Sequence, residues 1–305
     1  MDLKKLRVLF PNLNIEENAS MAEYCSFRAG GRAAALIQPA TVEELKGVLS
    51  YIHDEDIPHI ILGNGTNTLF SDGDHELAVI RLDGQVFNFM VCDRADEGIL
   101  KIGSAMLLST ASKMALDEGL SGMEGLSGIP GSLGGAVFMN AGAYGYEVKD
   151  VILSAHGVSP DGRDERDFTP EEMNLSYRHS AFMDNGYIVT SAVFGLKKDD
   201  PKAIKARMAD FTERRVTKQP LKYPSAGSTF TRPEGYFAGK LIEDSGLKGL
   251  TVGGAQVSEL HAGFVINRGG ATATDILQLI HLVQDVVFEK FGVKLEPEVR
   301  IIENK

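Results

Sequence analysis

The sequence predicts an α+β protein built from two domains, and three observations lead to that class. The chain has 305 residues, a length for which two domains are the usual expectation. Apolar residues make up 43% and charged residues 24% of it, proportions typical of a soluble globular protein. Short strand-like runs alternate with amphipathic helical runs through most of the chain. We place a domain boundary in the region of the helix predicted after Asp200.

The first elements form a strand–helix–strand unit. Residues 33–38 (AAALIQ) predict a strand. A helix is predicted from Thr41, which stands at capping-box spacing from Glu44. Residues 59–62 (HIIL) predict the next strand, which runs directly into residues 63–67 (GNGTN). A glycine-asparagine loop at the end of such a unit suits anion binding by backbone N–H groups.

The later elements follow from similar signals. They are a helix over 107–118, strands over 151–158 and 187–196, a helix from Asp200-Pro201 to about Arg215, a helix over 237–244, a strand over 263–267, a helix from Thr274 to Gly292, and a terminal strand over 293–302. Asp200-Pro201 supplies an N-cap and a proline at the first helical position, and Gly292 supplies a C-terminal cap. The last helix has apolar residues on one face, which we expect to be buried.

Residues 122–146 (GMEGLSGIPGSLGGAVFMNAGAYGY) carry the most information about function. Five glycines stand at intervals of three from Gly122 to Gly134, and three more follow. Glycine loses more backbone freedom on folding than any other residue, so this density indicates close approach of a ligand or unusual dihedral angles. Collagen requires many more repeats, and the glycines make a poor membrane span even though no charge occurs from Gly125 to Tyr146. We interpret the segment as buried, ligand-facing backbone.

Charge and cysteine content argue against several classes of function. The chain has 31 basic and 42 acidic side chains, a net charge of −11, which disfavours nucleic acid as the main partner. An anionic small molecule stays compatible if basic residues gather at its site. Cys25, Cys92 and the scattered histidines give neither a disulfide framework nor metal-ligand spacing. The N-terminus does not resemble a signal peptide, so we expect a cytoplasmic protein without a metal or a membrane partner.

Two glycine-rich loops in the N-terminal part predict a large phosphate-bearing cofactor. Neither is a known nucleotide fingerprint, because GxxxxGK[ST] is absent and GNGTNT does not fit GxGxxG. For residues 63–67 alone, a simple turn is an equally good interpretation. The second loop has eight glycines in 24 residues, which is harder to explain by turns.

Seven motifs then occur in order. They are SFRAGG (26–31), GNGTN (63–67), GIPGSLGGAVFMNAGAYG (128–145), SYRHSAF (176–182), PSAGSTFTRP (224–233), AGKLIEDSGLKG (238–249) and LEPEVRII (295–302). Together they closely resemble the UDP-N-acetylenolpyruvoylglucosamine reductase (MurB) family of bacterial cell-wall synthesis, over nearly the whole chain. Only residues 182–187 separate the arginine motif from the next strand, too few for the tyrosine-bearing loop of type I members. The resemblance is therefore to the shorter type II form.

The resemblance implies an α+β fold with an FAD-binding region of the vanillyl-alcohol-oxidase (PCMH) type. Residues 1–200 would bind FAD, in two subdomains of about 1–62 and 63–200, and residues 201–305 would bind the UDP substrate. Backbone N–H groups would hold FAD without a covalent bond. The residues implied at the FAD site are Gly63, Asn64, Gly65, Thr66, Asn67, Gly128, Ile129, Pro130, Gly131, Ser132, Gly134, Gly135, Ala136, Asn140 and Gly145.

The resemblance also implies an NADPH-dependent reduction of UDP-N-acetylglucosamine enolpyruvate to UDP-N-acetylmuramate. Hydride from reduced FAD would add to C3 of the enolpyruvyl group, and charge would spread into an enolate on its carboxylate. Arg178 would bind this carboxylate, Glu298 would orient or hydrogen-bond its acid form, and Ser228 would protonate C2. From the residues alone, a surface arginine, a solvated strand glutamate and a loop serine are the ordinary alternatives.

Residues near these motifs are predicted to bind the substrate. Tyr177 stands beside Arg178, and Lys218, Lys222 and Arg232 flank the serine loop. A loop anchor for Tyr177 and solvated loop charges for the others are the alternatives. We interpret His261 as a structural histidine.

Two other functions stay open for the sequence. An oxidase of the same flavin fold, acting on an alcohol or phenol, often attaches FAD through His or Cys, and here Cys25 or Cys92 would be needed. A non-catalytic protein that binds flavin or a nucleotide sugar would have no reason to keep Arg178, Ser228 and Glu298 together. We expect the protein to be a monomer.

Overall fold

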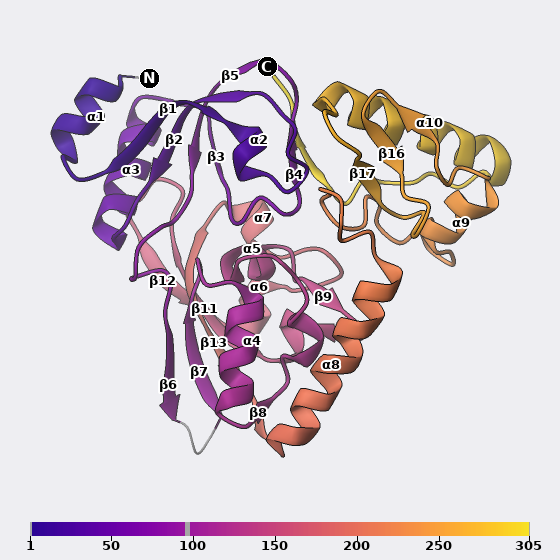
Figure 1. The fold of residues 1–305 in the computed structure, drawn as a ribbon. Coiled ribbons are helices and arrows are strands. Elements are labelled where there is room, and N and C mark those ends of the chain that lie inside the picture. The colour runs from indigo at the N-terminus through magenta and orange to yellow at the C-terminus, as the bar shows by residue number, and fades with distance from the viewer. Residues whose placement is uncertain (1, 95–97, 305) are drawn as a thin grey trace. The chain divides into compact units, whose positions relative to one another are not determined.

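The computed structural model describes residues 2–94 and 98–304 (Figure 1). Contacts within the chain divide it into two compact units. The first unit comprises Met1–Glu16, Ala35–Asn64 and Leu77–Glu213, and the second comprises Glu17–Ala34, Gly65–Glu76 and Arg214–Lys305. Buried apolar clusters lie within each unit, two in the first and one in the second.

The first strands of the chain form a four-stranded sheet. Its order is β1 (Asn14–Ser20), β2 (Arg32–Gln38), β5 (Asp74–Ile80) and β3 (His59–Ile61). Helix α3 (Val42–Asp54) buries its apolar face in one core of the first unit, to which α1 (Leu3–Leu9) also contributes. Thr41 caps α3 by accepting from the Glu44 N–H, as predicted, but the Glu44 carboxylate accepts from the Ala40 N–H instead of closing the capping box.

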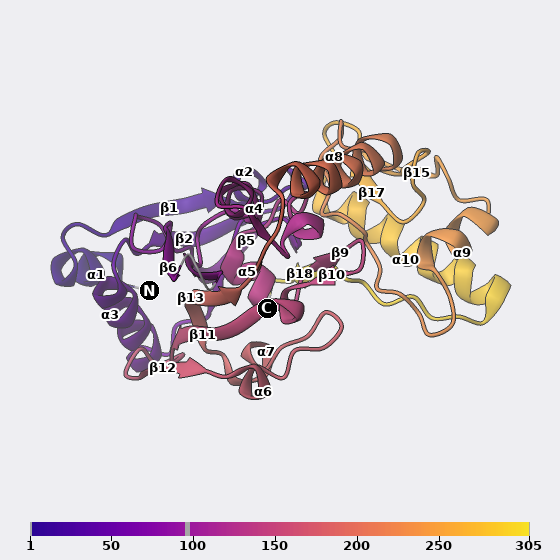
Figure 2. The ribbon, with the colours of Figure 1, turned by 90° about the horizontal axis from the view of Figure 1, so that it is seen from below.

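A five-stranded antiparallel sheet belongs to the first unit. Its order is β12 (Glu165–Phe168), β11 (Ile152–Val158), β13 (Ile188–Gly195), β7 (Ile99–Gly103) and β6 (Met90–Arg94). Helix α5 (Leu133–Phe138) packs on β13, and α4 (Leu108–Asp117) contributes to the same core. Helix α6 (Pro170–Met173) lies beside β11 and β12, as Figure 2 shows, and α7 (Phe182–Asn185) precedes β13.

Several short elements complete this unit. They are the 3-10 helices η2 (Glu124–Leu126) and η3 (Val148–Asp150), the pair β8 (Leu120–Ser121) with β14 (Lys197–Lys198), and the pair β9 (Gly142–Ala143) with β10 (Tyr146–Glu147). Helix α8 (Pro201–Lys218) begins in the first unit and ends in the second.

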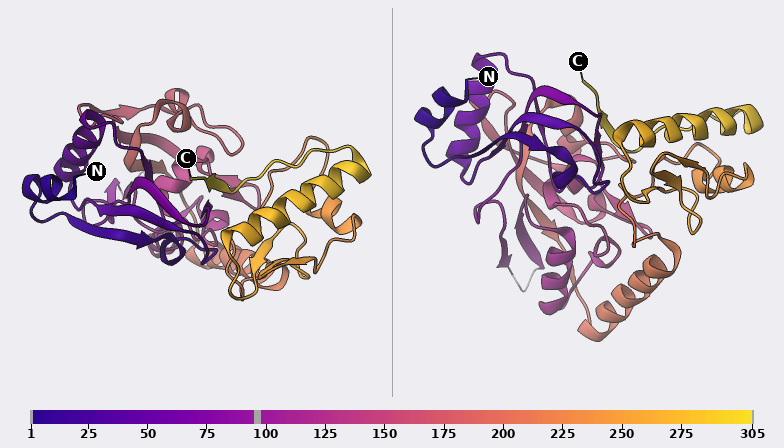
Figure 3. Two further views of the ribbon diagram at one scale, coloured as in Figure 1. Left: turned by 90° about the horizontal axis from the view of Figure 1, so that it is seen from above. Right: turned by 45° about the horizontal axis from the view of Figure 1, so that its top comes forward.

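The second unit is built on a three-stranded antiparallel sheet and a long helix. The sheet order is β15 (Thr251–Val252), β16 (Ala255–Val257) and β17 (Val265–Asn267). Helix α10 (Ala273–Phe291) packs along all three strands and against α9 (Ala238–Asp244), as Figure 3 shows. The unit also contains α2 (Met21–Tyr24) and the parallel pair β4 (Thr68–Phe70) with β18 (Arg300–Ile302).

The predicted buried face of α10 is confirmed. Its fully buried residues include Ile276, Leu279, Ile280, Val283 and Val287. Thr272 and Asp275 form a complete capping box, and Gly292 ends the helix in the left-handed conformation. The capping box and the C-terminal glycine therefore mark the ends of the same helix that the apolar pattern indicates.

Two predicted strands are shorter than expected. The terminal strand over 293–302 pairs only at Arg300–Ile302, and before it a single bridge joins Phe230 to Pro297. Proline has no N–H to donate, so a regular ladder cannot continue through residue 297. The strand predicted over 263–267 covers only Val265–Asn267. The glycine-rich segment also contains helix α5, which its glycine content did not predict.

Candidate active site

The two glycine-rich loops meet in the first unit. The Asn64 side chain donates from Nδ2 to the carbonyl of Pro130 at 2.7 Å. A Cβ at Gly63 would lie 2.6 Å from the Ser132 Oγ, so only glycine fits against that hydroxyl. The structure thus brings together two segments that were predicted separately to serve one cofactor.

The rest of the first loop lies in the second unit and is equally crowded. Gly65 has φ +63°, and a Cβ there would approach the Tyr24 carbonyl oxygen to 1.9 Å. Thr66 follows it, and the Asn67 Nδ2 donates to the Glu298 carbonyl at 2.9 Å. The backbone of the loop is therefore placed by contacts that leave no room for larger side chains at its glycines.

The second loop turns into helix α5 at Ser132. This serine caps the helix by accepting from the Gly135 N–H at 3.4 Å. Gly134 packs against Ser104, where a Cβ would come within 2.9 Å. Within the loop the predicted FAD-site residues differ in exposure: Gly128, Ile129, Gly131, Gly134 and Gly135 are half-buried, Pro130 and Gly145 are exposed, and Ser132 and Ala136 are buried. The uncharged, partly exposed backbone fits a ligand that is recognised by N–H groups.

Arg178 lies in a tight turn of the first unit. Ser176 and His179 exchange backbone hydrogen bonds of 3.1 and 3.2 Å around it, and Arg178 itself has φ +56°. Its guanidinium lies 4.9 Å from the centroid of the Tyr177 ring and donates to the Gly142 carbonyl at 3.3 Å. The predicted catalytic arginine therefore reaches the backbone of the glycine-rich segment.

Asn140, within that segment, is fully buried and faces the arginine turn. Its Nδ2 donates to the Ser176 carbonyl at 2.8 Å and to Glu147 Oε2 at 3.0 Å, and its Oδ1 accepts from the Lys149 N–H at 3.0 Å. Sequence reasoning missed Glu147, although it is the first acidic residue after the uncharged stretch. A hydrogen bond from Lys149 is the main reason why the pKa of Glu147 lies below its ordinary value.

Ser228 and Glu298 lie on neighbouring backbone segments of the second unit. The Glu298 N–H donates to the Thr229 carbonyl at 2.8 Å, one residue after Ser228. Gly227, with φ +80° and open space around it, forms the turn that leaves Ser228 exposed, while Glu298 is half-buried. Two of the three predicted catalytic residues are thus adjacent, and Arg178 belongs to the other unit.

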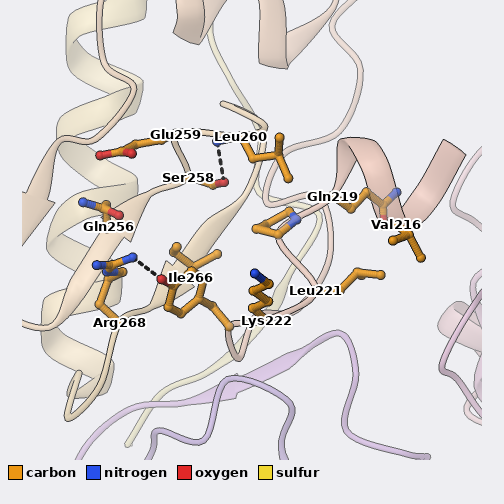
Figure 4. A pocket seen from close by; sticks show the side chains of 12 residues that line it. Val216, Gln219, Leu221, Lys222, Gln256, Ser258, Glu259, Leu260, Ile266 and Arg268 are labelled. Atoms are coloured by element: carbon orange, nitrogen blue, oxygen red, sulfur yellow. Dashed lines mark hydrogen bonds between the residues drawn. The ribbon is translucent and has the colours of Figure 1, made fainter. Parts of the chain in front are cut away.

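The predicted substrate-binding cations are distributed around this region of the second unit. Lys218 is the exposed last residue of α8, and the Arg232 guanidinium lies 4.6 Å from the centroid of the Phe237 ring. Lys222 lines a pocket of about 330 Å³ between the 219–223 loop and strands β16 and β17 (Figure 4). In the same pocket Arg268 lies over the Tyr223 ring and donates to its hydroxyl.

Two further groups have informative pKa shifts. Burial lowers the pKa of His261, whose Nδ1 accepts from the Gly263 N–H at 3.1 Å, so the neutral ring carries its proton on Nε2. Burial also raises the pKa of the Cys25 thiol to about 12. Neither residue is arranged as a nucleophile or a general base.

Family models match both parts of the chain. Residues 33–166 match the FAD binding domain, and residues 219–302 match the C-terminal domain of UDP-N-acetylenolpyruvoylglucosamine reductase. A reductase of that name from Clostridium novyi is 48% identical over 299 residues, covering 98% of this chain and 95% of the relative. One from Listeria innocua is 45% identical over 300 residues, covering 98% and 99%.

The chain belongs to the UDP-N-acetylenolpyruvoylglucosamine reductase family. The crystal structure of the Thermus caldophilus MurB has a TM-score of 0.82 and 36% identity to it, over 95% of this chain and 99% of the other. A BBE-like 1 protein from Physcomitrella patens is 15% identical to this chain, with a TM-score of 0.50. The match covers 65% of this chain and 45% of the other protein, and it shows a shared fold only.

Membership of the MurB family confirms the resemblance seen in the motifs. The FAD-binding-domain match and the MurB structure also confirm the predicted α+β class with an FAD-binding region. Helix α7 (Phe182–Asn185) occupies the short span between the arginine motif and β13. In residues 2–94 and 98–304, none of the helices combines the length and apolarity needed to cross a bilayer.

Proposed function

We propose that this protein reduces UDP-N-acetylglucosamine enolpyruvate to UDP-N-acetylmuramate, with FAD as cofactor and NADPH as reductant. The observation that carries the proposal is the match over 98% of the chain to reductases of this name, at 45–48% identity. The reaction belongs to peptidoglycan precursor synthesis. We further propose that the protein acts as a cytoplasmic monomer, with residues 1–200 binding FAD and residues 201–305 the UDP substrate.

FAD binding is assigned to the two glycine-rich loops. The contacts at Gly63 and Asn64 hold the start of the first loop against Pro130 and Ser132, so this part of the site is preorganised before any cofactor arrives. Neutral backbone N–H groups would satisfy the diphosphate, and bound FAD would supply the hydride chemistry.

Arg178 is assigned the substrate carboxylate. Reduction at C3 converts the enolpyruvyl carboxylate into an enolate, whose charge grows as the reaction proceeds. A planar guanidinium offers paired N–H donors to such a group and stabilises the charged form more than the starting ether. Its stacking on Tyr177 restricts the side chain without removing its charge.

Ser228 is assigned the proton transfer to C2, and Glu298 the orientation of the carboxylate. An unperturbed serine is a weak acid, but an enolate carbon is a strong base, so the proton need not come from a perturbed group. The hydrogen bond from Glu298 N–H to Thr229 fixes the two backbone segments to each other. Their relative position therefore depends on backbone contacts rather than on either functional side chain.

A covalent flavin oxidase is the rival enzyme, and Cys25, one of the two cysteines that it could use, is poorly suited to form the bond. The thiol is 4% exposed and its pKa of about 12 leaves almost no thiolate at neutral pH. Release of intact FAD from acid-denatured protein would agree with the reductase, and flavin that stays with the polypeptide would favour the oxidase.

The test separates the two half-reactions in a Ser228→Ala variant. Reduction of the flavin by NADPH should stay within about twofold of wild type, because that step needs no proton donor to carbon. Reoxidation by UDP-N-acetylglucosamine enolpyruvate should slow by about 10²–10⁴-fold, the usual contribution of a positioned acid. Ser225→Ala, three residues earlier in the same loop, is the matched control. Equal losses in both half-reactions would remove Ser228 from the mechanism.

A further inference from the structure

We propose that Asn140 is the positioning residue of Arg178, and that it acts through the Ser176 carbonyl rather than by contact with FAD. The proposal rests on the function proposed above, in which Arg178 binds the substrate carboxylate. The family resemblance implied that Asn140 binds FAD, and the present proposal replaces that role. It also includes Glu147, whose carboxylate accepts a hydrogen bond from the Asn140 amide.

The turn that carries Arg178 is strained and needs support from its surroundings. Ser176 and His179 close the turn, and Arg178 at its third position has φ +56°. Turns with a positive φ at this position usually place glycine or asparagine there. A residue with a Cβ is disfavoured in the left-handed region, and such strain persists at functional sites when neighbouring contacts hold it.

Two contacts from the end of helix α5 hold the two ends of this turn. At the first end, the Ser176 carbonyl accepts both the His179 N–H, at 3.2 Å, and the Asn140 amide, at 2.8 Å. At the other end, the fully buried Ser180 donates its hydroxyl to the Phe138 carbonyl at 2.5 Å. The strained turn is therefore fixed to residues 138–140, at the end of helix α5 and within the glycine-rich segment.

The side chain of Asn140 can take only one orientation. Its φ is +44° and it has 0% exposure. The Lys149 N–H must face the amide oxygen, so the amide nitrogen faces Ser176 and Glu147, and both of its hydrogens are used. The side chain therefore has no N–H donor left for FAD, whereas loss of the bond to Ser176 would release the turn.

Glu147 makes this arrangement sensitive to charge. Its carboxylate accepts from Asn140 and forms an ion pair of 2.6 Å with Lys149. Its pKa is lowered by the hydrogen bond from Lys149 and, to a smaller extent, by the charge of Arg178. A carboxylate at position 140 would therefore face both Glu147 and the Ser176 carbonyl, and would lose the donor that holds the turn.

The experiment compares Asn140→Asp with Asn174→Asp in both half-reactions. Asn174 also has φ +44°, but it is an exposed C-cap of α6 and serves as the control. For Asn140→Asp, reoxidation by UDP-N-acetylglucosamine enolpyruvate should fall on the order of 10²-fold, as expected when a charged group is displaced by about an ångström. Reduction by NADPH and the Kd for FAD should stay within about twofold.

A double-mutant cycle with Arg178→Lys tests whether Asn140 acts through the arginine. In the Arg178→Lys background, Asn140→Asp should cost far less than its effect in the wild type, because the interaction that it supports is already lost. If Asn140→Asp does not fold, Ser180→Ala removes the other support of the turn and should slow reoxidation selectively in the same way.

The outcomes distinguish this proposal from the proposed function. A wild-type flavin that the enolpyruvate cannot reoxidise defeats the proposed function, and the role of Asn140 with it. A normal wild type with unchanged reoxidation in Asn140→Asp defeats only the positioning role. A weakened Kd for FAD with normal reoxidation of the bound flavin would instead place Asn140 at the cofactor.

Discussion

Gly65 shows at the scale of one residue why the first loop tolerates so little change. Its φ is +63°, and a Cβ would lie 1.9 Å from the Tyr24 carbonyl oxygen. Gly65→Ala must therefore move backbone as well as adopt a left-handed conformation. We expect a loss of about 3 kcal/mol in the free energy of unfolding, at the upper end for overpacking. Gly246→Ala, also left-handed but in open space, should lose only about 1 kcal/mol in the same urea titration. Equal losses would contradict the crowding argument.

Cys25 gives a prediction for chemical reactivity. Burial raises its pKa to about 12, so at pH 8 the thiolate that attacks aromatic disulfide reagents is nearly absent. In a Cys92→Ser variant, the native protein should release almost no chromophore from such a reagent. The Cys25 thiol should react after guanidinium has unfolded the protein. Rapid labelling of the native variant would show that Cys25 is accessible.

At the scale of elements, Glu124 connects η2 to helix α8 through Arg207. Glu124 is 1% exposed and accepts from Arg207 at 2.7 Å, from the Gly122 N–H at 2.7 Å and from Ser121 at 2.8 Å. Burial alone would raise the pKa of this carboxyl, but the hydrogen bonds outweigh it and hold the pKa below its ordinary value of 4.5. The carboxylate therefore stabilises the fold above about pH 4.5, and this contribution is lost as the pH falls through the folded pKa.

A Glu124→Gln variant tests this connection. At pH 7 the variant should lose about 2 kcal/mol in the free energy of unfolding. This loss is smaller than for a fully buried ion pair because Arg207 is 34% exposed. Below the folded pKa of Glu124, which lies under its ordinary value of 4.5, the two proteins should converge, since the wild-type carboxyl is then protonated as well. The urea midpoints of both proteins at a series of pH values measure this. A difference that stays constant into acid would contradict the role of the charge.

The elements that the sequence predicts best are those with capped ends. Thr41 accepts the hydrogen bond expected of the N-cap of α3, and Gly292 ends α10 where the sequence predicted it. The N-cap of α10 is Thr272, although the helix was predicted from Thr274. Strands β6 and β7 carry no comparable end signals and were not predicted, since they are defined by their partners across the sheet. The motifs identified Arg178, Ser228 and Glu298 as functional residues, whereas the bond from Asn140 to Ser176 depends on a contact across 36 residues that no local pattern contains.

At the scale of the whole molecule, the distribution of charge and the FAD-binding domain both agree with the proposed reductase activity. The chain has a net charge of −11, yet basic residues slightly outnumber acidic ones from Arg214 onward, where an anionic UDP substrate is proposed to bind. FAD binds only the folded chain, so it should raise the unfolding temperature of the cofactor-free protein in proportion to the logarithm of its concentration. Riboflavin, which lacks the diphosphate, is the matched control ligand. A shift that is equally large with riboflavin would contradict the role of the glycine loops in diphosphate binding.

The most direct measurement is an anaerobic cycle of the bound flavin. Purified protein is reduced with NADPH until the flavin absorbance is lost, and UDP-N-acetylglucosamine enolpyruvate is then added. Rapid return of the oxidised spectrum, with one UDP-N-acetylmuramate formed for each flavin, is the predicted result. Flavin that bleaches but does not return with this substrate would contradict the proposed function while leaving the FAD-binding fold intact.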